Sequence, residues 1–191
     1  MNNKEKFAKY TELLREWSKI MNLVAPSTLT DIENRHFADS MQLVGVIPKD
    51  VYVADMGSGA GFPGVVLAIM GWDVTCIESI GKKASFLNTV KQSLDLPNLN
   101  IFHGRVEDFV KNIKQGDTEL IFTARAFAPL IKILDYVYKT KSRLFLLKGR
   151  EIEAEIKTAK EKYKFDYNLI PSKTGDGFII TIENIKLFHM K

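Results

Sequence analysis

The stretch DMGSGAGFPG, residues 55–64, packs four glycines into ten positions directly behind a short apolar run, VYVA. Glycine loses more conformational freedom on folding than any other residue, so such a loop is costly unless the backbone must turn sharply or approach a ligand. An apolar run, a glycine-rich loop and a helical pattern over about 62–70 together indicate a βα unit with a ligand at its loop.

The spacing of the glycines separates two kinds of ligand. The dinucleotide pattern G-x-G-x-x-G needs its third glycine at position 62, where this chain has Phe62. Gly57, Gly59 and Gly61 instead give D-x-G-x-G-x-G counted from Asp55, a spacing typical of S-adenosylmethionine-dependent methyltransferases. A phosphate-binding P-loop is excluded, because no Gly-Lys-Ser/Thr closes the loop.

Two carboxylates complete the expected cofactor site. Asp55 can attract the ammonium group of the cofactor's amino-acid end, directly or through water. Glu78 ends the predicted strand WDVTCIE, and a carboxylate at this tip can accept hydrogen bonds from both ribose hydroxyls. The separation of Glu78 from the loop fits the roughly 20 residues expected for such a group.

The composition is that of an ordinary globular protein, with 191 residues of which 46% are hydrophobic and 26% charged. This length predicts one domain, which we divide into a helical cap, 1–47, and an α/β core, 48–191. No apolar run approaches the roughly 20 residues that span a bilayer, and the N-terminus lacks a signal peptide's apolar core, so we expect a cytoplasmic protein with no membrane partner. Cys76 is the single cysteine, which excludes an intramolecular disulfide and a multi-cysteine metal site.

The positive charge is unevenly distributed along the chain. The formal net charge is +4, and residues 101–150 hold ten basic but only five acidic residues. This quarter includes Lys139, Lys141, Arg143, Lys148 and Arg150. Such a patch can contact phosphates, and a solvated lysine-rich face explains the same excess.

The order of the elements predicts an α/β fold. Residues 2–21 show the spacing of an amphipathic helix, and Ser27 or Thr28 is expected to cap a second helix that runs to about Val46. From Val51 onward, five strand-like runs alternate with helical ones, which indicates a mostly parallel sheet covered on both faces. The last two strand candidates are separated only by the turn PSKTGDG, so they form a hairpin that adds one antiparallel strand.

The acceptor of the methyl group restricts the side chains that are needed, because the sulfonium is already activated and the enzyme supplies mostly orientation. Methylation of pyrimidine C5 needs a cysteine nucleophile, and Cys76 lies inside a predicted strand. Exocyclic amines commonly use an Asn/Asp-Pro-Pro-aromatic loop, where this chain has the sequence ARAFAP at 124–129. A ring nitrogen with a free lone pair, such as guanine N7, needs no base.

His36 and Ser40 fall inside the apolar arc of the second helix, where His36 is either a packed core group or a residue that faces the site.

Several further segments carry a resemblance to a known family. They are Asn22-Leu23-Val24-Ala25, Arg35-His36-Phe37-x-Asp39-Ser40, the loop 55–64 with its Phe-Pro-Gly ending, Glu78-Ser79-x-x-Lys82-Lys83-x-x-Phe86-Leu87, Arg105-Val106-Glu107, Ala124-Arg125-Ala126-Phe127-Ala128 and Leu147-Lys148-Gly149. In these segments the chain resembles the bacterial N7-guanine methyltransferases of small-subunit ribosomal RNA, also called glucose-inhibited division protein B. One departure is Leu120, where the family usually has an aspartate, which leaves the register of the fourth strand open.

The resemblance implies a Rossmann-like class I methyltransferase fold of seven strands, the seventh antiparallel. It implies S-adenosylmethionine as methyl donor, no metal, and a guanine of 16S ribosomal RNA as acceptor, in the free RNA or an assembled or partly assembled 30S subunit. Besides Asp55, Gly59 and Glu78, the expected cofactor contacts are Gly57, Phe62, Val106, Glu107 and Arg125. Arg125 can bind the cofactor carboxylate or a phosphate, and Arg125 and His36 are candidates for positioning the substrate. Lys82, Lys83, Lys148 and Arg150 are candidate RNA contacts, and we expect a monomer.

Three other functions remain open at this point. The first is a methyltransferase of the same fold that acts on another RNA or on a small molecule. The second is a dinucleotide-dependent oxidoreductase, which Phe62 opposes. The third is a non-catalytic RNA-binding protein that keeps the fold, which the intact glycine loop opposes.

Overall fold

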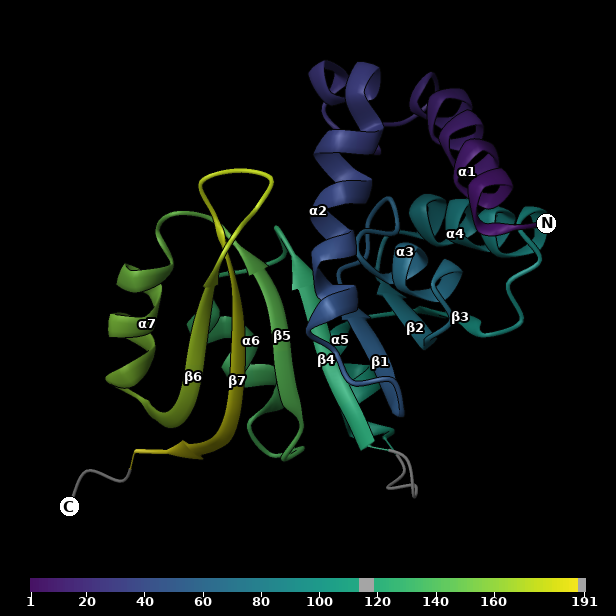
Figure 1. The fold of residues 1–191 in the computed structure, drawn as a ribbon. Helices are drawn as coiled ribbons and strands as arrows, with labels where there is room; N and C mark the ends of the chain where they lie inside the picture. Colours follow the sequence, from purple (N-terminus) through teal and green to yellow (C-terminus); the bar gives the residue numbers. More distant parts are fainter. Residues whose placement is uncertain (114–118, 189–191) are drawn as a thin grey trace.

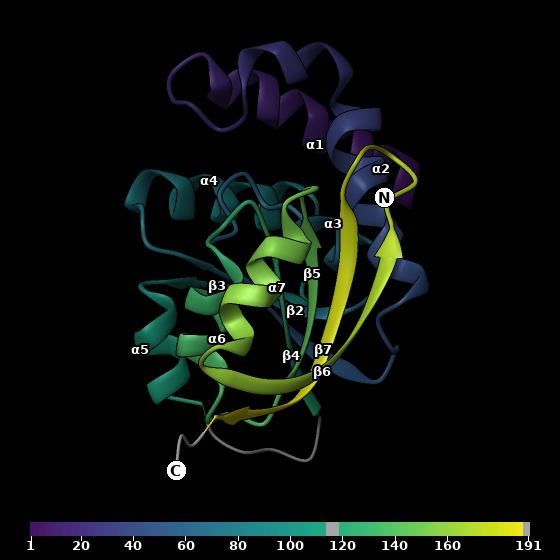
Figure 2. The same cartoon turned by 90° about the vertical axis from the view of Figure 1, so that its left-hand side faces the viewer.

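The computed structural model describes residues 1–113 and 119–188 and contains a seven-stranded sheet with helices on both faces (Figure 1, Figure 2). The strands are β1 (Val51–Met56), β2 (Asp73–Glu78), β3 (Leu99–His103), β4 (Glu119–Arg125), β5 (Arg143–Lys148), β6 (Tyr163–Pro171) and β7 (Phe178–Leu187). Their order across the sheet is β3-β2-β1-β4-β5-β7-β6, and β7 runs antiparallel to both of its neighbours. The predicted hairpin and its single antiparallel strand are therefore confirmed.

Two apolar clusters hold the helices to the sheet. The helices after β1 are α3 (Gly64–Ile69), α4 (Gly81–Ser93), α5 (Val106–Lys111), α6 (Leu130–Val137) and α7 (Ile152–Lys160). Buried side chains of α3 and α4 join the cluster on one face, and those of α5, α6 and α7 join the cluster on the other (Figure 2). Fully buried strands of this kind have apolar side chains on both faces, as in β1, where five of six residues are buried.

The strand order reverses between β1 and β4, which is where open α/β sheets bind their ligands. The two strands are parallel, and Val51 pairs with Glu119 while Leu120 pairs with Tyr52. Leu120 therefore lies in regular strand register, and the departure at this position leaves the strand intact. The loops that follow the strands meet at one edge of the sheet, and they include the glycine loop.

The N-terminal part is helical, but its second half does not form the single helix that we predicted. Helix α1 (Asn3–Ser18) is regular, with a capping box between Asn2 and Glu5. The next segment winds as a 3₁₀ helix, a π turn, an α turn and a second 3₁₀ helix: η1 (Pro26–Asp31), η2 (Glu33–Phe37), α2 (Ala38–Met41) and η3 (Gln42–Gly45). Its start is set by Pro26 at the first helical position, and no side chain caps it, so the predicted cap at Ser27 or Thr28 is wrong.

These N-terminal helices pack over the glycine-loop side of the sheet. Tyr10 and Leu14 of α1 are fully buried, and Trp17 lies edge-on to Phe86 of α4 with ring centroids 5.5 Å apart. Figure 1 shows α1 beside α4 and the α2 segment beside α3. Within the described residues, none of the helices has the length and apolar character that a membrane crossing requires.

Candidate functional site

The glycine loop turns sharply at the end of β1. Gly57 and Gly59 have φ angles of +65° and +56°, in the left-handed region that side chains disfavour. The Ser58 N–H donates to the carbonyl of Ile77 in β2, which ties the loop to the neighbouring strand at 3.0 Å. A side chain at Gly57 would overlap the ring of Phe127, so this aromatic residue of the β4–α6 loop packs directly on the glycine backbone.

Asp55 lies fully buried beneath this loop. Its Oδ2 accepts a hydrogen bond of 3.0 Å from the Gly64 N–H, whereas its Oδ1 has no partner among the described residues. Burial raises the pKa of Asp55 to about 7, although the Gly64 N–H offsets part of the effect. The fold therefore presents a buried acceptor atom whose hydrogen-bonding capacity is unused.

Glu78 closes the other side of the loop. One carboxylate oxygen accepts from the Gly59 N–H and the other from the Ile80 N–H, each at 2.8 Å. Its exposed fraction is 5%, so the carboxylate is held at the tip of β2 by the backbone around it. The predicted pairing of loop and carboxylate is thus present as direct contact.

Phe62 is turned toward the N-terminal helices. Its ring stacks on His36 at a centroid distance of 4.9 Å and lies 5.5 Å from the ring of Tyr10. Only 4% of the residue is exposed. The ring therefore anchors the loop to the cap, and the aromatic surface that we expected to face a cofactor is largely used in this packing.

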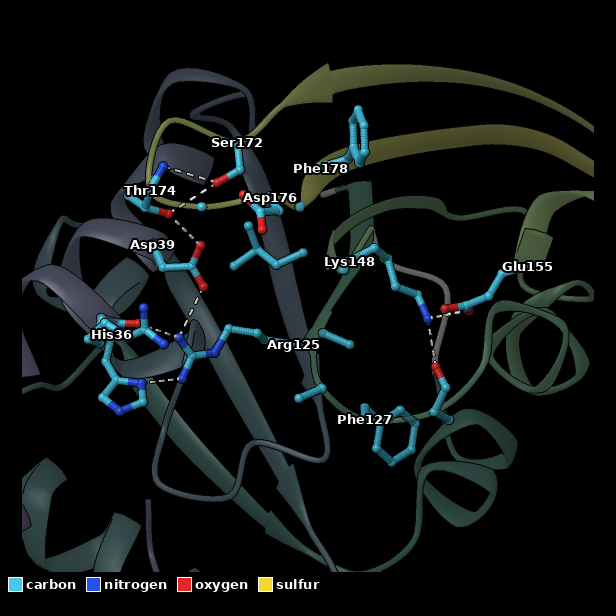
Figure 3. A pocket seen from close by; sticks show the side chains of 18 of the residues that line it. His36, Asp39, Arg125, Phe127, Lys148, Glu155, Ser172, Thr174, Asp176 and Phe178 are labelled. Atoms are coloured by element: carbon cyan, nitrogen blue, oxygen red, sulfur yellow. Dashed lines mark hydrogen bonds and ion pairs between the residues drawn. The ribbon is translucent and has the colours of Figure 1, made fainter. Parts of the chain in front are cut away.

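Arg125 joins the tip of β4 to the cap. Its guanidinium donates to Asp39 Oδ2 at 3.1 Å, to the Arg35 carbonyl at 3.3 Å and to His36 Nδ1 at 2.6 Å (Figure 3). The same group lies 5.0 Å from the centroid of the Phe62 ring. Arg125 therefore connects the glycine loop to the second helical segment. The sequence did not predict this connection.

These contacts fix the tautomer of His36. A guanidinium can only donate, so Nδ1 carries a lone pair and the proton sits on Nε2, which donates to Thr28 Oγ1 at 2.8 Å. Burial and the neighbouring Arg125 charge lower the pKa of His36 to about 4. His36 is thus a neutral group whose two ring nitrogens both have hydrogen-bond partners. It is packed against Phe62, and it also lines the cavity beside Arg125.

A cavity of about 970 Å³ lies beside this junction, between the second helical segment, the ends of β4 and β5, and the β6–β7 loop. Figure 3 shows Arg125, His36 and Asp39 on one side of it, Phe127 and Phe178 on two others, and the pair Lys148–Glu155 opposite. It is lined by aromatic, apolar and charged groups together, which suits a flat polar ring such as a nucleobase.

Lys148 has a different partner from the one we expected. Its ammonium group contacts Glu155 Oε2 at 2.6 Å and the Ala128 carbonyl at 2.8 Å, and its side chain is only 9% exposed. Glu155 also accepts from the Leu130 N–H, so the pair holds the β4–α6 loop against α7. Lys148 is therefore less suited to binding an RNA phosphate than its sequence position indicated.

The remaining predicted residues lie at the same edge of the sheet. Val106 is buried at the start of α5, and Glu107 follows it with a side chain 37% exposed, so both border the end of β3. Lys82 begins α4 with Lys83, just beyond Glu78, and Arg150 follows β5 as an exposed residue. Cys76 is fully buried in β2, where it cannot act as a nucleophile toward a bound base.

Three parts of the site were missed in the sequence. Phe127, Glu155 and the β6–β7 loop all line the cavity, and they come from segments far apart in the chain. In the sequence, Ser172, Thr174 and Gly175 predict only a turn. No local signal shows that such a turn meets the N-terminal helices.

Comparisons with known proteins place the chain in a family. A family model described as rRNA small subunit methyltransferase G matches residues 3–174. A protein of that name from Orientia tsutsugamushi is 42% identical over 176 residues, which cover 90% of this chain and 85% of the relative. Another from Bradyrhizobium diazoefficiens is 38% identical over 182 residues, which cover 91% and 69%.

Solved structures are similar in fold at low sequence identity. An O-methyltransferase from Bacillus cereus in complex with SAH has a TM-score of 0.62 at 15% identity, covering 92% of this chain and 91% of that one. A TehB-like SAM-dependent methyltransferase from Corynebacterium glutamicum has a TM-score of 0.56 at 15% identity, covering 94% and 99%. The fold is therefore that of class I methyltransferases. With the family model covering nine-tenths of its length, the chain belongs to the rRNA small subunit methyltransferase G family.

Proposed function

We propose that this protein transfers the methyl group of S-adenosylmethionine to N7 of a guanine in the RNA of the small ribosomal subunit. The observation that carries the proposal is the family match over residues 3–174, which spans the glycine loop, Glu78 and Arg125. A relative that bears the family name is 42% identical to this chain over 176 residues.

The residues around the glycine loop fit this methyl donor. Asp55 Oδ1 is a buried acceptor that has no partner in residues 1–113 and 119–188, which matches an ammonium group or a water that carries its hydrogen bond. Glu78 supplies a carboxylate at the tip of β2 for the ribose hydroxyls, and Val106 with Glu107 borders the next strand end, beside the expected adenine. Gly59 leaves the loop backbone open to close approach, since a Cβ at this position would have its nearest neighbour, the Gly57 carbonyl oxygen, at 3.9 Å. When bound, the cofactor supplies an activated methyl group on its sulfonium.

The protein's part in the reaction is orientation. Arg125, His36 and Phe62 form one stacked and hydrogen-bonded unit, which holds the end of the glycine loop against the wall of the cavity. Two surfaces that must meet across a methyl group are thereby fixed relative to each other. Such positioning is the main source of rate enhancement for a displacement at an activated carbon.

The ionisable groups of the cavity favour an acceptor that needs no base. His36 receives the Arg125 hydrogen bond on Nδ1, Asp39 faces Arg125, and Glu155 faces Lys148. Asp176 is the remaining acid among the described lining residues, and it is exposed at the rim, away from the Arg125 side of the cavity. Guanine N7 has a free lone pair and loses no proton before it attacks, so this environment suits it better than an amine.

The decisive experiment uses small ribosomal subunits from a bacterium that lacks the family's gene. The enzyme and methyl-labelled S-adenosylmethionine are incubated with these subunits or with the free 16S RNA. We expect the labelled methyl group on one guanine of the RNA. After mild reduction, aniline should cleave the RNA at this guanine, as it does at N7-methylated guanine.

The outcomes separate the alternatives. Label at a position that resists this cleavage would show another acceptor atom and contradict the N7 assignment. Absence of label from both substrates, together with intact cofactor binding by calorimetry, would favour a methyltransferase with another RNA or a small molecule as substrate. Binding of the RNA without any binding of cofactor would indicate the non-catalytic alternative.

A further inference from the structure

The β6–β7 loop, residues 172–177, is held in place by the N-terminal part of the chain. Every side-chain hydrogen bond that leaves this loop, within the part of the chain that the structure describes, runs to Gln42 or Asp39. Gln42 begins η3, about 130 residues earlier in the sequence. Five of the loop's six residues line the cavity, so the bridge also shapes the proposed acceptor site.

The amide of Gln42 serves the loop with both of its polar atoms. Its Nε2 lies 3.0 Å from Thr174 Oγ1 and 3.2 Å from Ser172 Oγ. Its Oε1 accepts from the Lys173 backbone N–H at 2.7 Å. A side chain that pairs with a backbone amide and two hydroxyls of one turn fixes both the position and the orientation of that turn.

Asp39 extends the bridge to the floor of the cavity. Its Oδ1 accepts from Thr174 Oγ1 at 3.0 Å, and its Oδ2 accepts from Arg125 at 3.1 Å (Figure 3). The loop at the rim and the arginine at the end of β4 are thus attached to the same carboxylate. None of these hydrogen bonds runs to Asp55, Gly57 or Glu78. The bridge reaches the glycine loop indirectly, through Arg125, whose guanidinium lies 5.0 Å from the centroid of the Phe62 ring.

We propose that Gln42 is a positioning residue of the acceptor site: it holds the β6–β7 loop as a wall of the cavity and so sets the affinity for the RNA acceptor, not for the methyl donor. The inference rests on the proposed function, which gives the cavity its occupant. A loop with small and polar residues at its tip is free to sample many conformations unless it is tied down. Binding an acceptor against an untied wall carries the extra cost of ordering that wall.

The test replaces Gln42 and Thr174. Gln42→Ala removes the bridge from the helical side, and Thr174→Val removes one hydroxyl from the loop while keeping the shape of the side chain. We expect the KM for small subunits to rise roughly fivefold to tenfold in Gln42→Ala and about twofold to fivefold in Thr174→Val, the scale of one net hydrogen bond or slightly more. The kcat and the dissociation constant of S-adenosylmethionine should stay within about twofold of wild type, because the hydrogen bonds that Gln42 and Thr174 make among the described residues do not run to the glycine loop. Thr174→Ser keeps the hydroxyl and should restore the wild-type KM.

A second readout does not depend on activity. Hydrogen exchange followed by mass spectrometry should show faster exchange of the loop amides in Gln42→Ala, with the peptides of the glycine loop unchanged. Gln92→Ala, an identical replacement at an exposed position of α4, is the matched control and should change neither exchange nor KM.

Each result decides a separate question. If exchange in the loop is unchanged, or if exchange rises while the KM stays at its wild-type value, the positioning role is wrong. A cofactor dissociation constant that rises together with the KM would also overturn it, because the bridge would then support both sites. If Gln42→Ala does not fold, the Thr174→Val and Thr174→Ser pair carries the same comparison at an exposed position. Failure of the wild-type enzyme to methylate small subunits refutes the proposed function instead.

Discussion

Asp55 shows how one buried atom couples cofactor binding to pH. Its pKa of about 7 lies well above the ordinary 3.8, so between these values the folded protein holds a proton that the unfolded chain has lost. Stability therefore falls as the pH rises through this window and is constant above about 7. An ammonium group placed beside Oδ1 favours the ionised carboxylate and reverses this preference.

We therefore predict that S-adenosylmethionine binds more weakly below pH 7, by up to about tenfold for each pH unit, and that its binding releases a proton. Isothermal titration calorimetry at pH 6 in two buffers of different ionisation enthalpy measures that release directly. Asp55→Asn keeps an oxygen for the Gly64 N–H and should remove the pH dependence. Equal dissociation constants at pH 5.5 and 8 in the wild-type protein would contradict the assignment.

Gly57 occupies a position that disfavours any side chain, because of both its backbone angle and its neighbour. A β-branched residue at φ +65° is strained by about 1–2 kcal/mol, and its side chain would also collide with Phe127. We expect Gly57→Val to abolish cofactor binding in calorimetry and to lower the melting temperature. Gly45→Ala, where a Cβ meets nothing within 4 Å, is the matched control and should leave both unchanged. Unaltered cofactor affinity in Gly57→Val would mean that the loop does not form the cofactor site.

At the scale of elements, the sequence predicted the strands and the residues at their tips, because strand, glycine loop and carboxylate are local patterns. Asp55 accepts a hydrogen bond from Gly64 and Glu78 accepts one from Gly59, so both carboxylates are bound to the one glycine loop beside which their spacing placed them. The winding of residues 26–45 was not predictable, since 3₁₀, π and α turns share nearly the same apolar spacing. Partners far apart in sequence, such as Lys148 with the Ala128 carbonyl or Gln42 with Ser172, leave no local signal at all.

Helix α1 supports the glycine loop through Tyr10. The Tyr10 hydroxyl donates to the Ala60 carbonyl at 2.5 Å, and both residues are buried. Tyr10→Phe leaves this carbonyl without a donor, at a cost of about 1–3 kcal/mol. We expect a lower melting temperature and a several-fold higher dissociation constant for S-adenosylmethionine. Tyr138→Phe alters a partly buried tyrosine of the opposite face and serves as control. Unchanged cofactor affinity in a destabilised Tyr10→Phe would limit α1 to a purely structural role.

At the scale of the whole molecule, the basic quarter of the sequence does not form one patch. Arg143 begins β5 and pairs with Glu119, which begins β4, at 2.6 Å, and Lys139 and Lys141 immediately precede it. These cations therefore lie at the amino ends of the strands. Arg150 follows the carboxyl end of β5, the edge that carries the proposed site. The basic residues that could contact phosphates as one patch are thus divided between two ends of the sheet.

This division allows the RNA-facing edge to be identified by salt dependence. Lys82, Lys83 and Arg150 stand at the edge that holds the glycine loop and the cavity, whereas Lys139 stands at the opposite edge. Each phosphate contact contributes about 0.7–0.9 to the slope of log affinity against log salt concentration. We predict that Arg150→Gln, and the double variant Lys82→Gln/Lys83→Gln, raise the KM for small subunits and lower this slope by up to about one unit per lost contact. Lys139→Gln removes the same charge and should leave the slope and the KM unchanged.

An equal loss of slope in Lys139→Gln would show that RNA is attracted by net charge alone. Unchanged slopes in Arg150→Gln and in Lys82→Gln/Lys83→Gln would place the RNA on another face.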